Sequence, residues 1–379
     1  MREVLKNSID GEIPDHLGLA YDAWAPTEVA DGKVSDNNRR TWLQKLAELA
    51  VSPDYVHGFE RWKASFSNAG DRLAELTLES RLLVGHGNAS AIDVGLTVHH
   101  TWGVPVIPGS ALKGLVAHYV DATYGPTESG RKPWEQQGDE RVRADYQGVT
   151  WNRRRIERGP GAVYRALFGS PDARDDATMR ENGFEAGAAA GLVTFHDALY
   201  VPGSLAGNKP FAADVLTVHQ KGYYDSLGQN LPNDYDSPNP VAFLTVRPKC
   251  RFLLALSGPS EWTELAAQLL ADALRNWGVG GKTAAGYGIG TVVEWKAPEL
   301  PASQVLGEFE TWLTDEARTG TPQRQRLNDI SQQWLTRLAS LSDDERQRAA
   351  SAIRRVVRSP KLTQARDDLL SRIARGNDQ

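Results

Sequence analysis

The spacing of hydrophobic residues along the chain changes from helical to alternating near residue 72. Residues 37–50 and 54–66 carry apolar side chains at helical spacing and predict two helices. From residue 73 to residue 84 polar and apolar positions alternate, which predicts a half-buried strand. Residues 1–71 are therefore expected to form an N-terminal helical extension, and residues 1–35 within it are expected to be irregular.

The pattern beyond this strand predicts a small mixed domain. Capping and amphipathic signals predict helices over residues 111–120 and 262–277. Apolar runs and alternation predict further strands over residues 191–198, 241–246, 251–256 and 291–295. The resulting order is strand, helix, two or more strands, helix and strand. This order is the βαββαβ pattern of an α+β, ferredoxin-like (RNA-recognition-motif-like) core, which we place at residues 72–297.

Two long polar stretches interrupt this core, and a helical region follows it. Residues 122–162 have no clear period, and residues 202–240 are dense in glycine, proline and asparagine, so both are expected to be insertions. Residues 303–379 carry apolar side chains at helical spacing and predict a helical C-terminal region. Within that region, the run from Ser342 to Glu345 is typical of a helix-capping box.

Net charge, cysteine content and the length of apolar runs exclude several kinds of site and location. The formal net charge of −5 means that any contact with nucleic acid must come from local patches. The lone Cys250 excludes an intrachain disulfide and a cysteine-based zinc cluster. No apolar run approaches the length of a membrane span. We therefore expect a cytoplasmic protein without membrane contact, and we predict no cofactor and no metal site.

The most distinctive stretch is the glycine-rich run at residues 278–290. Its backbone N–H groups could hold an oxyanion such as phosphate, Lys282 adds a charge, and Tyr287 offers a flat face to a base. It is not a nucleoside-triphosphate loop, because Asn276 replaces the required glycine and the predicted helix comes before the run. The alternative is a turn that only reverses the chain. The candidate RNA-binding residues here are Gly280, Gly281, Lys282, Thr283 and Tyr287.

A second phosphate-binding candidate lies at the start of the helix predicted at residues 111–120. Pro108 and Gly109 mark a turn, Ser110 is predicted as the N-cap, and Lys113 falls in the first turn. A helix N-terminus beside these two side chains suits a phosphate group. A capped helix with a solvated lysine is the alternative interpretation.

The two insertions add weaker candidates. The first mixes aromatic residues with arginines, among them Arg153 and Arg154, and such a mixture can bind a nucleic-acid strand. The second carries Lys221 and Tyr223, which would suit a thumb that projects, orders on assembly and contacts RNA. A solvated surface loop is the alternative for each.

No catalytic arrangement is evident in the sequence. His99 and His100 could act as general acid and base in RNA cleavage, although neighbouring side chains on an extended chain point apart. Asp93 in the same loop could act on a 2′-hydroxyl group, or it could only form a turn. We therefore assign no catalytic residue.

The segment 103–114 resembles the repeat-associated (RAMP) superfamily of CRISPR proteins, and the run at residues 278–288 resembles that superfamily's glycine-rich loop. Residues 167–169 and 191–198 fit the middle section of the same superfamily. Residues 215–219, 223–224 and 239–246 are similar to the sixth-subunit family of the type III-B (Cmr) effector complex.

The resemblance implies a non-catalytic subunit that holds the backbone of guide RNA (crRNA) near its 3′ end, in antiviral defence. Target RNA and the other Cmr subunits are the implied partners. Backbone subunits of such complexes cleave target RNA with a loop aspartate, and Asp93 lies in the corresponding loop. The alternative is a stand-alone endoribonuclease of the same superfamily that matures guide RNA with His99, His100 or His118.

Overall fold

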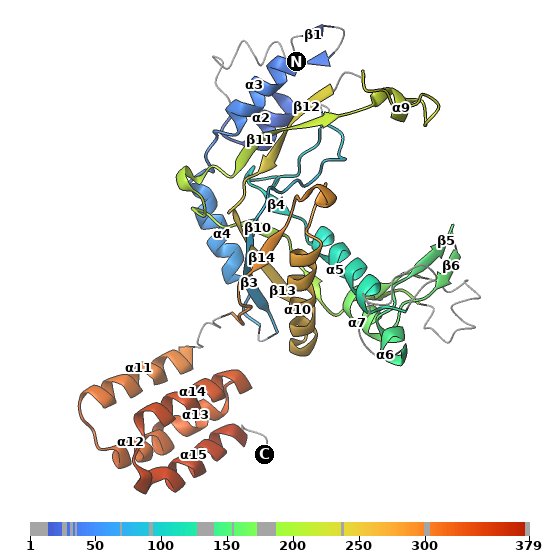
Figure 1. Ribbon diagram of the computed structural model, residues 1–379. Coiled ribbons are helices and arrows are strands. Elements are labelled where there is room, and N and C mark those ends of the chain that lie inside the picture. Colours follow the sequence, from blue (N-terminus) through green and yellow to red (C-terminus); the bar gives the residue numbers. More distant parts are fainter. Residues whose placement is uncertain are drawn as a thin grey trace. The chain divides into compact units, whose positions relative to one another are not determined.

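The computed structural model describes most of the chain (Figure 1). The described residues are 14–24, 29–30, 33–34, 36–68, 70–90, 94–126, 140–153, 155–172, 187–235, 239–298 and 304–375. The chain forms two units, residues 1–298 and residues 299–379. The first is a mixed α and β unit with an antiparallel sheet, and the second is helical.

The main sheet of the first unit is antiparallel throughout, in the order β14-β3-β13-β10-β4, with β9 also paired to β13. Its strands are β3 (Arg72–Leu78), β4 (Val106–Ile107), β9 (Thr194–Phe195), β10 (Ala198–Tyr200), β13 (Arg251–Ser257) and β14 (Gly290–Val292). Side chains of β3 alternate between buried and half-buried, as the sequence pattern predicts. Residues 252–256 of β13 are all buried, so both faces of this central strand are covered.

Helices α5 (Gly109–Tyr124) and α10 (Ser260–Asn276) pack against each other beside this sheet (Figure 1). The ring of Tyr119 on α5 lies 5.3 Å from the ring of Trp277, which ends α10. The Asn276 amide donates a hydrogen bond of 3.2 Å to the Tyr119 hydroxyl. These contacts bring the start of the glycine-rich run against the middle of α5.

The remaining elements of the first unit surround this core. Helix α4 (Asp54–Ala64) contacts the sheet through Tyr55, whose hydroxyl donates to the carbonyl of Tyr200 at 2.6 Å. The other elements are α2 (Leu17–Ala23), β1 (Val29–Ala30), β2 (Lys33–Val34), α3 (Asp36–Leu46), α6 (Glu140–Asp145), β5 (Thr150–Asn152), β6 (Arg155–Arg158), α7 (Ala162–Phe168), β7 (Gly169–Ser170), β8 (Ala189–Ala190) and the 3₁₀ turns η2 (Ala206–Asn208) and η3 (Thr283–Ala285).

A separate two-stranded ribbon forms between β10 and β13. Strand β11 (Phe211–Val218) pairs in register with β12 (Asn239–Val246), from Phe211 opposite Val246 to Val218 opposite Asn239. Helix α3 contacts both strands, and the short helix α9 (Lys221–Asp225) lies at the far end of the ribbon (Figure 1). The sequence predicts residues 202–240 as an insertion without a long regular element, and the eight-residue strand β11 corrects that expectation.

Two other predictions from the sequence are wrong. Residues 1–35 are not irregular throughout, because α2 forms at Leu17–Ala23 and buries Leu17 and Tyr21. Its N-cap is His16, whose imidazole accepts a hydrogen bond from the Leu19 amide. The single strand expected at residues 191–198 is instead two short strands, β9 and β10, on either side of His196 and Asp197.

The second unit has a hydrophobic core of its own, which includes Leu306, Phe309, Trp334 and Ile353. Its elements are α11 (Gln304–Arg318), α12 (Gln323–Asp329), a π-helical turn (Ile330–Trp334), α13 (Leu335–Ala339), α14 (Asp343–Val356), η5 (Pro360–Leu362) and α15 (Thr363–Arg375). The helical C-terminal region is confirmed. Across both units, none of the described helices combines the length and the apolar character needed to cross a membrane.

The capping box at the start of α14 provides a test of the second unit. The Ser342 side chain accepts from the Glu345 amide, and the Glu345 carboxylate accepts from the Ser342 amide. We expect Ser342→Ala to lower the free energy of unfolding of residues 299–379 by about 1 kcal/mol, measured by urea denaturation. Ser351→Ala, on the exposed face of the same helix, is the control and should change it little. Equal effects of the two substitutions would contradict the capping role.

Candidate nucleic-acid interface

The glycine-rich run is bound along the backbone segment that continues β3. The amide of Gly281 donates to the carbonyl of Leu83, and the amide of Gly288 donates to the carbonyl of Arg81, both at 2.7 Å. The Glu79 amide donates to the carbonyl of Ile289 at 2.9 Å. The run therefore extends the β3–β14 pair as a fixed loop, in addition to reversing the chain.

Two glycines make this close approach possible. A Cβ atom on Gly280 would lie 2.4 Å from the Leu83 carbonyl oxygen, and one on Gly288 would lie 1.9 Å from the Val279 carbonyl oxygen. Both residues also have positive φ, at +90° and +74°. Only glycine meets both requirements without strain, so these two positions set the shape of the loop.

The amides that remain open lie in one short stretch. Among the described residues, the backbone N–H groups of Lys282, Thr283 and Ala284 have no hydrogen-bond partner. They lie at the start of the 3₁₀ turn η3, where Lys282 has a left-handed backbone with φ of 60°. Successive N–H groups in such a conformation form a concave site for an anion. The Gly281 amide, a candidate from the sequence, is already bonded within the chain.

His86 is a neighbour of this loop that the sequence analysis did not select. Its Cβ atom lies 3.6 Å from the position of a Cβ on Gly281. Burial, and then the charge of Lys282, lower the pKa of this histidine. Its Nδ1 atom is buried and has no hydrogen-bond partner among the described residues. The Gly85-His86-Gly87 triplet was the only sequence signal for it.

Tyr287 connects the glycine-rich loop to the β11–β12 ribbon. Its hydroxyl donates to Asp214 on β11 at 2.8 Å, and the Arg81 Nε atom lies 3.4 Å from the same carboxylate oxygen. Burial, and then this hydrogen bond to the carboxylate, raise the pKa of Tyr287 to about 12. The half-buried ring packs against the cluster of Leu83, Val94 and Phe243. The hydroxyl therefore has a structural role beyond the base contact predicted from the sequence.

The start of α5 differs from the prediction at one residue. Pro108 is the N-cap, without a capping hydrogen bond from its side chain, and Ser110 lies inside the helix. The Asp197 carboxylate, from the segment between β9 and β10, instead accepts from the Gly109 amide at 2.7 Å. The carboxylate of Asp197 therefore occupies the helix N-terminus at which the sequence predicted a phosphate. Lys113 is half-buried in the first turn, where only its ammonium group could contact a phosphate.

The first insertion contains a basic hairpin formed by β5 and β6 (Figure 1). Arg153 is exposed at its turn with φ of 56°, and Arg154 lies outside the described residues. Trp151 on β5 is half exposed. Below the turn, Arg158 pairs with Asp121 at 3.1 Å, which fixes the hairpin to the end of α5.

The two lysines of the second insertion, Lys209 and Lys221, lie on either side of β11. Lys209 pairs with Glu48 at 2.9 Å before β11 begins. Lys221 begins α9, and Tyr223 stacks edge-on against the ring of Tyr224 at 5.4 Å in the same short helix.

The histidines considered for catalysis make separate contacts, although His99 and His100 are neighbours in the chain. His99 Nδ1 accepts from the Thr101 amide, and burial lowers the pKa of His99. The backbone carbonyl of His100 contacts the imidazole of His16, while the His118 ring lies 5.2 Å from that of Trp277. Asp93 lies outside the described residues. Within the described ranges, no three His, Cys, Asp or Glu side chains gather as a metal site would require.

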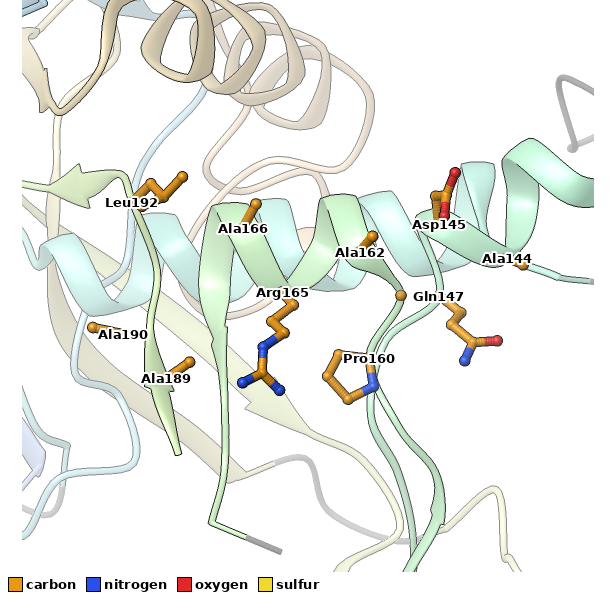
Figure 2. A pocket seen from close by; sticks show the side chains of 11 residues that line it. Ala144, Asp145, Gln147, Pro160, Ala162, Arg165, Ala166, Ala189, Ala190 and Leu192 are labelled. Carbon is orange, nitrogen blue, oxygen red and sulfur yellow. The ribbon is translucent and has the colours of Figure 1, made fainter. Parts of the chain in front are cut away.

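A pocket of about 660 Å³ lies between the end of α6, α7 and β8. Figure 2 shows the side chain of Arg165 beside Pro160 and the strand that carries Ala189 and Ala190. Its guanidinium group donates to the carbonyl of Gly187 at 3.3 Å. The rest of the lining is mainly small and apolar, which differs from the polar loop described above.

Comparison with known proteins gives consistent family matches. The model of the RAMP superfamily matches residues 75–292. The CRISPR system Cmr subunit Cmr6 of Pyrococcus furiosus is 30% identical over 336 residues, which covers 76% of this chain and 98% of that protein.

Two solved structures are also similar to this chain. One is the type III-B Cmr-beta complex bound to cognate target RNA, with 17% identity, a TM-score of 0.42, and coverage of 71% of this chain and 78% of the other. The other is the crystal structure of Cmr6 from Pyrococcus furiosus, with 31% identity, a TM-score of 0.31, and coverage of 59% and 97%.

Two glycines of the loop allow a matched test, because both have positive φ but only Gly288 has no room for a side chain. Gly286→Ala introduces a side chain at φ of +85° into open space, and should lower the free energy of unfolding by about 1–2 kcal/mol. Gly288→Ala adds a clash with a carbonyl oxygen to the same backbone strain, and should cost about 3 kcal/mol or more. Urea denaturation of the first unit measures both. A Gly288→Ala protein as stable as Gly286→Ala would show that the loop does not pack as described.

Proposed function

The chain belongs to the RAMP superfamily and, within it, to the family of the CRISPR system subunit Cmr6, and from this we propose that it is a guide-RNA-binding subunit of a type III-B CRISPR effector complex. It would hold the RNA backbone near the guide 3′ end, contact target RNA and neighbouring Cmr subunits, and cleave neither RNA. Its place in antiviral defence follows from the same proposal.

The observation that carries RNA binding is the stretch Lys282–Thr283–Ala284. Three successive open amides and one ammonium group lie on a loop that is otherwise fixed to β3. A backbone phosphate matches both kinds of donor. The fixed loop needs no reordering when RNA binds, so little binding energy is lost in arranging these donors.

Such a site suits a protein that leaves sequence recognition to base pairing. In guided complexes the guide pairs with its target, and the protein contacts the shape and charge of the backbone. A chain with net charge −5 can do this where lysine and open amides coincide, although its whole surface does not attract RNA. Lys113 on α5 and Arg153 on the β5–β6 hairpin are the proposed further contacts.

We also propose that the core is ferredoxin-like. The strand order β14-β3-β13-β10 corresponds to strands four, one, three and two of a βαββαβ unit. Helix α5 lies between the first and second of these strands along the chain, and α10 lies between the third and fourth. Both connecting helices pack together beside the sheet.

The absence of catalysis is part of the proposal, supported by the separate contacts of His99 and His118. A histidine acid–base pair requires both rings to reach one scissile phosphate. Guide RNA recovered after binding in metal-free buffer should therefore be intact. Cleavage that is lost in a His99→Ala, His100→Ala or His118→Ala protein would favour the endoribonuclease alternative.

The direct test is the salt dependence of RNA binding. Lys282→Ala should weaken binding of single-stranded guide RNA and lower the slope of log affinity against log salt concentration by about 0.7, because one phosphate contact is lost. Fluorescence anisotropy over a salt series measures this slope. Lys296→Ala removes an exposed lysine just after β14 and is the control, expected to leave the slope unchanged. Equal slopes for the wild type and the Lys282→Ala protein would contradict a phosphate contact.

A further inference from the structure

The far end of the β11–β12 ribbon, residues 222–235, displays large apolar side chains to solvent. The exposed fractions are 67% for Tyr224, 93% for Leu227, 83% for Leu231 and 94% for Tyr235. We call these residues the ribbon tip. Four exposed apolar side chains of this size within twelve residues are uncommon on a protein surface unless they meet a partner.

Local hydrogen bonds give the first half of the ribbon tip a defined shape. The Gly228 amide donates to the carbonyl of Tyr223 at 2.8 Å, and the Asn230 amide donates to the Ser226 hydroxyl at 2.8 Å. Leu227 has a left-handed backbone with φ of 53°. That conformation is costly for leucine, and such strain is often found where a chain contacts a ligand or partner. Leu227 is therefore exposed on a turn that has a defined conformation.

The charge of the ribbon tip distinguishes a protein partner from RNA. Residues 222–235 contain no lysine, arginine or histidine, and they include Asp225 and Asp234. Lys221, the RNA-contact candidate from the sequence, lies just before this range at the start of α9. Affinity for RNA depends largely on cations that neutralise phosphates, and two carboxylates oppose that contact. Apolar side chains flanked by carboxylates instead complement an apolar groove with basic side chains at its rim.

We propose that the ribbon tip is a docking element for a neighbouring protein subunit, whose surface offers an apolar groove with a basic rim. This inference rests on the proposed membership of an effector complex, which supplies the neighbour. It gives the two hairpins of the first unit different partners. The β5–β6 hairpin with Arg153 faces RNA, and the ribbon tip faces protein.

A photo-cross-linker identifies the class of the partner directly. Tyr235→p-benzoylphenylalanine places the reactive group on a fully displayed side chain, in the full chain assembled with guide RNA and the other purified Cmr subunits. Irradiation should join this chain to another protein subunit. Adducts to RNA, adducts between two copies of this chain, or no adducts would each overturn the proposal.

Substitution tests whether the contact contributes to assembly. The Leu227→Asp/Leu231→Asp protein should fold normally, because both side chains are exposed, and should bind the subunits about 30-fold more weakly, as expected for loss of an interface hot spot. Asp225→Asn with Asp234→Asn should weaken binding less and reduce its salt dependence. Val293→Asp changes an exposed apolar side chain elsewhere in the same unit and is the control. The affinity for guide RNA alone should be unchanged in all three.

The outcomes separate the two proposals. If the wild-type chain enters the complex and the double leucine variant enters equally well, this inference is refuted and the proposed function stands. If the double variant loses RNA affinity while subunit binding is retained, the ribbon tip belongs to RNA and the inference is refuted. If the wild-type chain fails to enter the complex at all, the proposed function and this inference are refuted together.

Discussion

Three consecutive residues after β3, Arg81 to Leu83, support both the glycine-rich loop and the β11–β12 ribbon. On one edge, the carbonyls of Arg81 and Leu83 accept from the glycine-rich loop. On the other edge, Leu82 exchanges two backbone hydrogen bonds with Val246 at the end of β12. The Arg81 side chain adds hydrogen bonds to Ala213 and Thr245 of the ribbon. The loop and the ribbon therefore share one rigid support.

This arrangement supports the proposal that an acidic chain presents a local site for RNA. The loop keeps its shape because glycine at positions 280 and 288 lets the backbone approach neighbouring carbonyl groups without a clash. That shape leaves three amides and Lys282 open on one side, while Tyr287 and Asp214 join the loop to the ribbon on the other. The positive character of the site comes from oriented N–H groups as well as from side chains, so overall composition gives little sign of it.

The sequence predicted the local features of this fold well. The alternation in β3, the helix that becomes α10 and the capping box at Ser342 each depend on side chains only a few residues apart. Strand β12 was predicted at residues 241–246, whereas β11 was missed because glycine, proline and asparagine beyond residue 218 obscured its strand signal.

The candidate site was predictable only in part, because its decisive contacts come from distant residues. The N-terminus of α5, where a phosphate was expected, is hydrogen-bonded to Asp197, which lies 88 residues from Gly109 in the sequence. The hydroxyl of Tyr287 donates to Asp214, which is 73 residues away. The pattern of glycines located the loop and Lys282. It could not show which amides would be used within the chain, because that depends on the carbonyls of Arg81 and Leu83.

The proposed function requires that open amides on a fixed loop bind the RNA backbone. Hydrogen–deuterium exchange resolved to single residues, on the chain with and without guide RNA, measures this contact at each amide. The amides of Gly281 and Gly288 should be protected in both states, since they are bonded to Leu83 and Arg81. The amides of residues 282–284 should exchange fast in the free chain and become protected when RNA binds. Bound RNA with no added protection at residues 282–284 would show that these amides do not bind the RNA backbone.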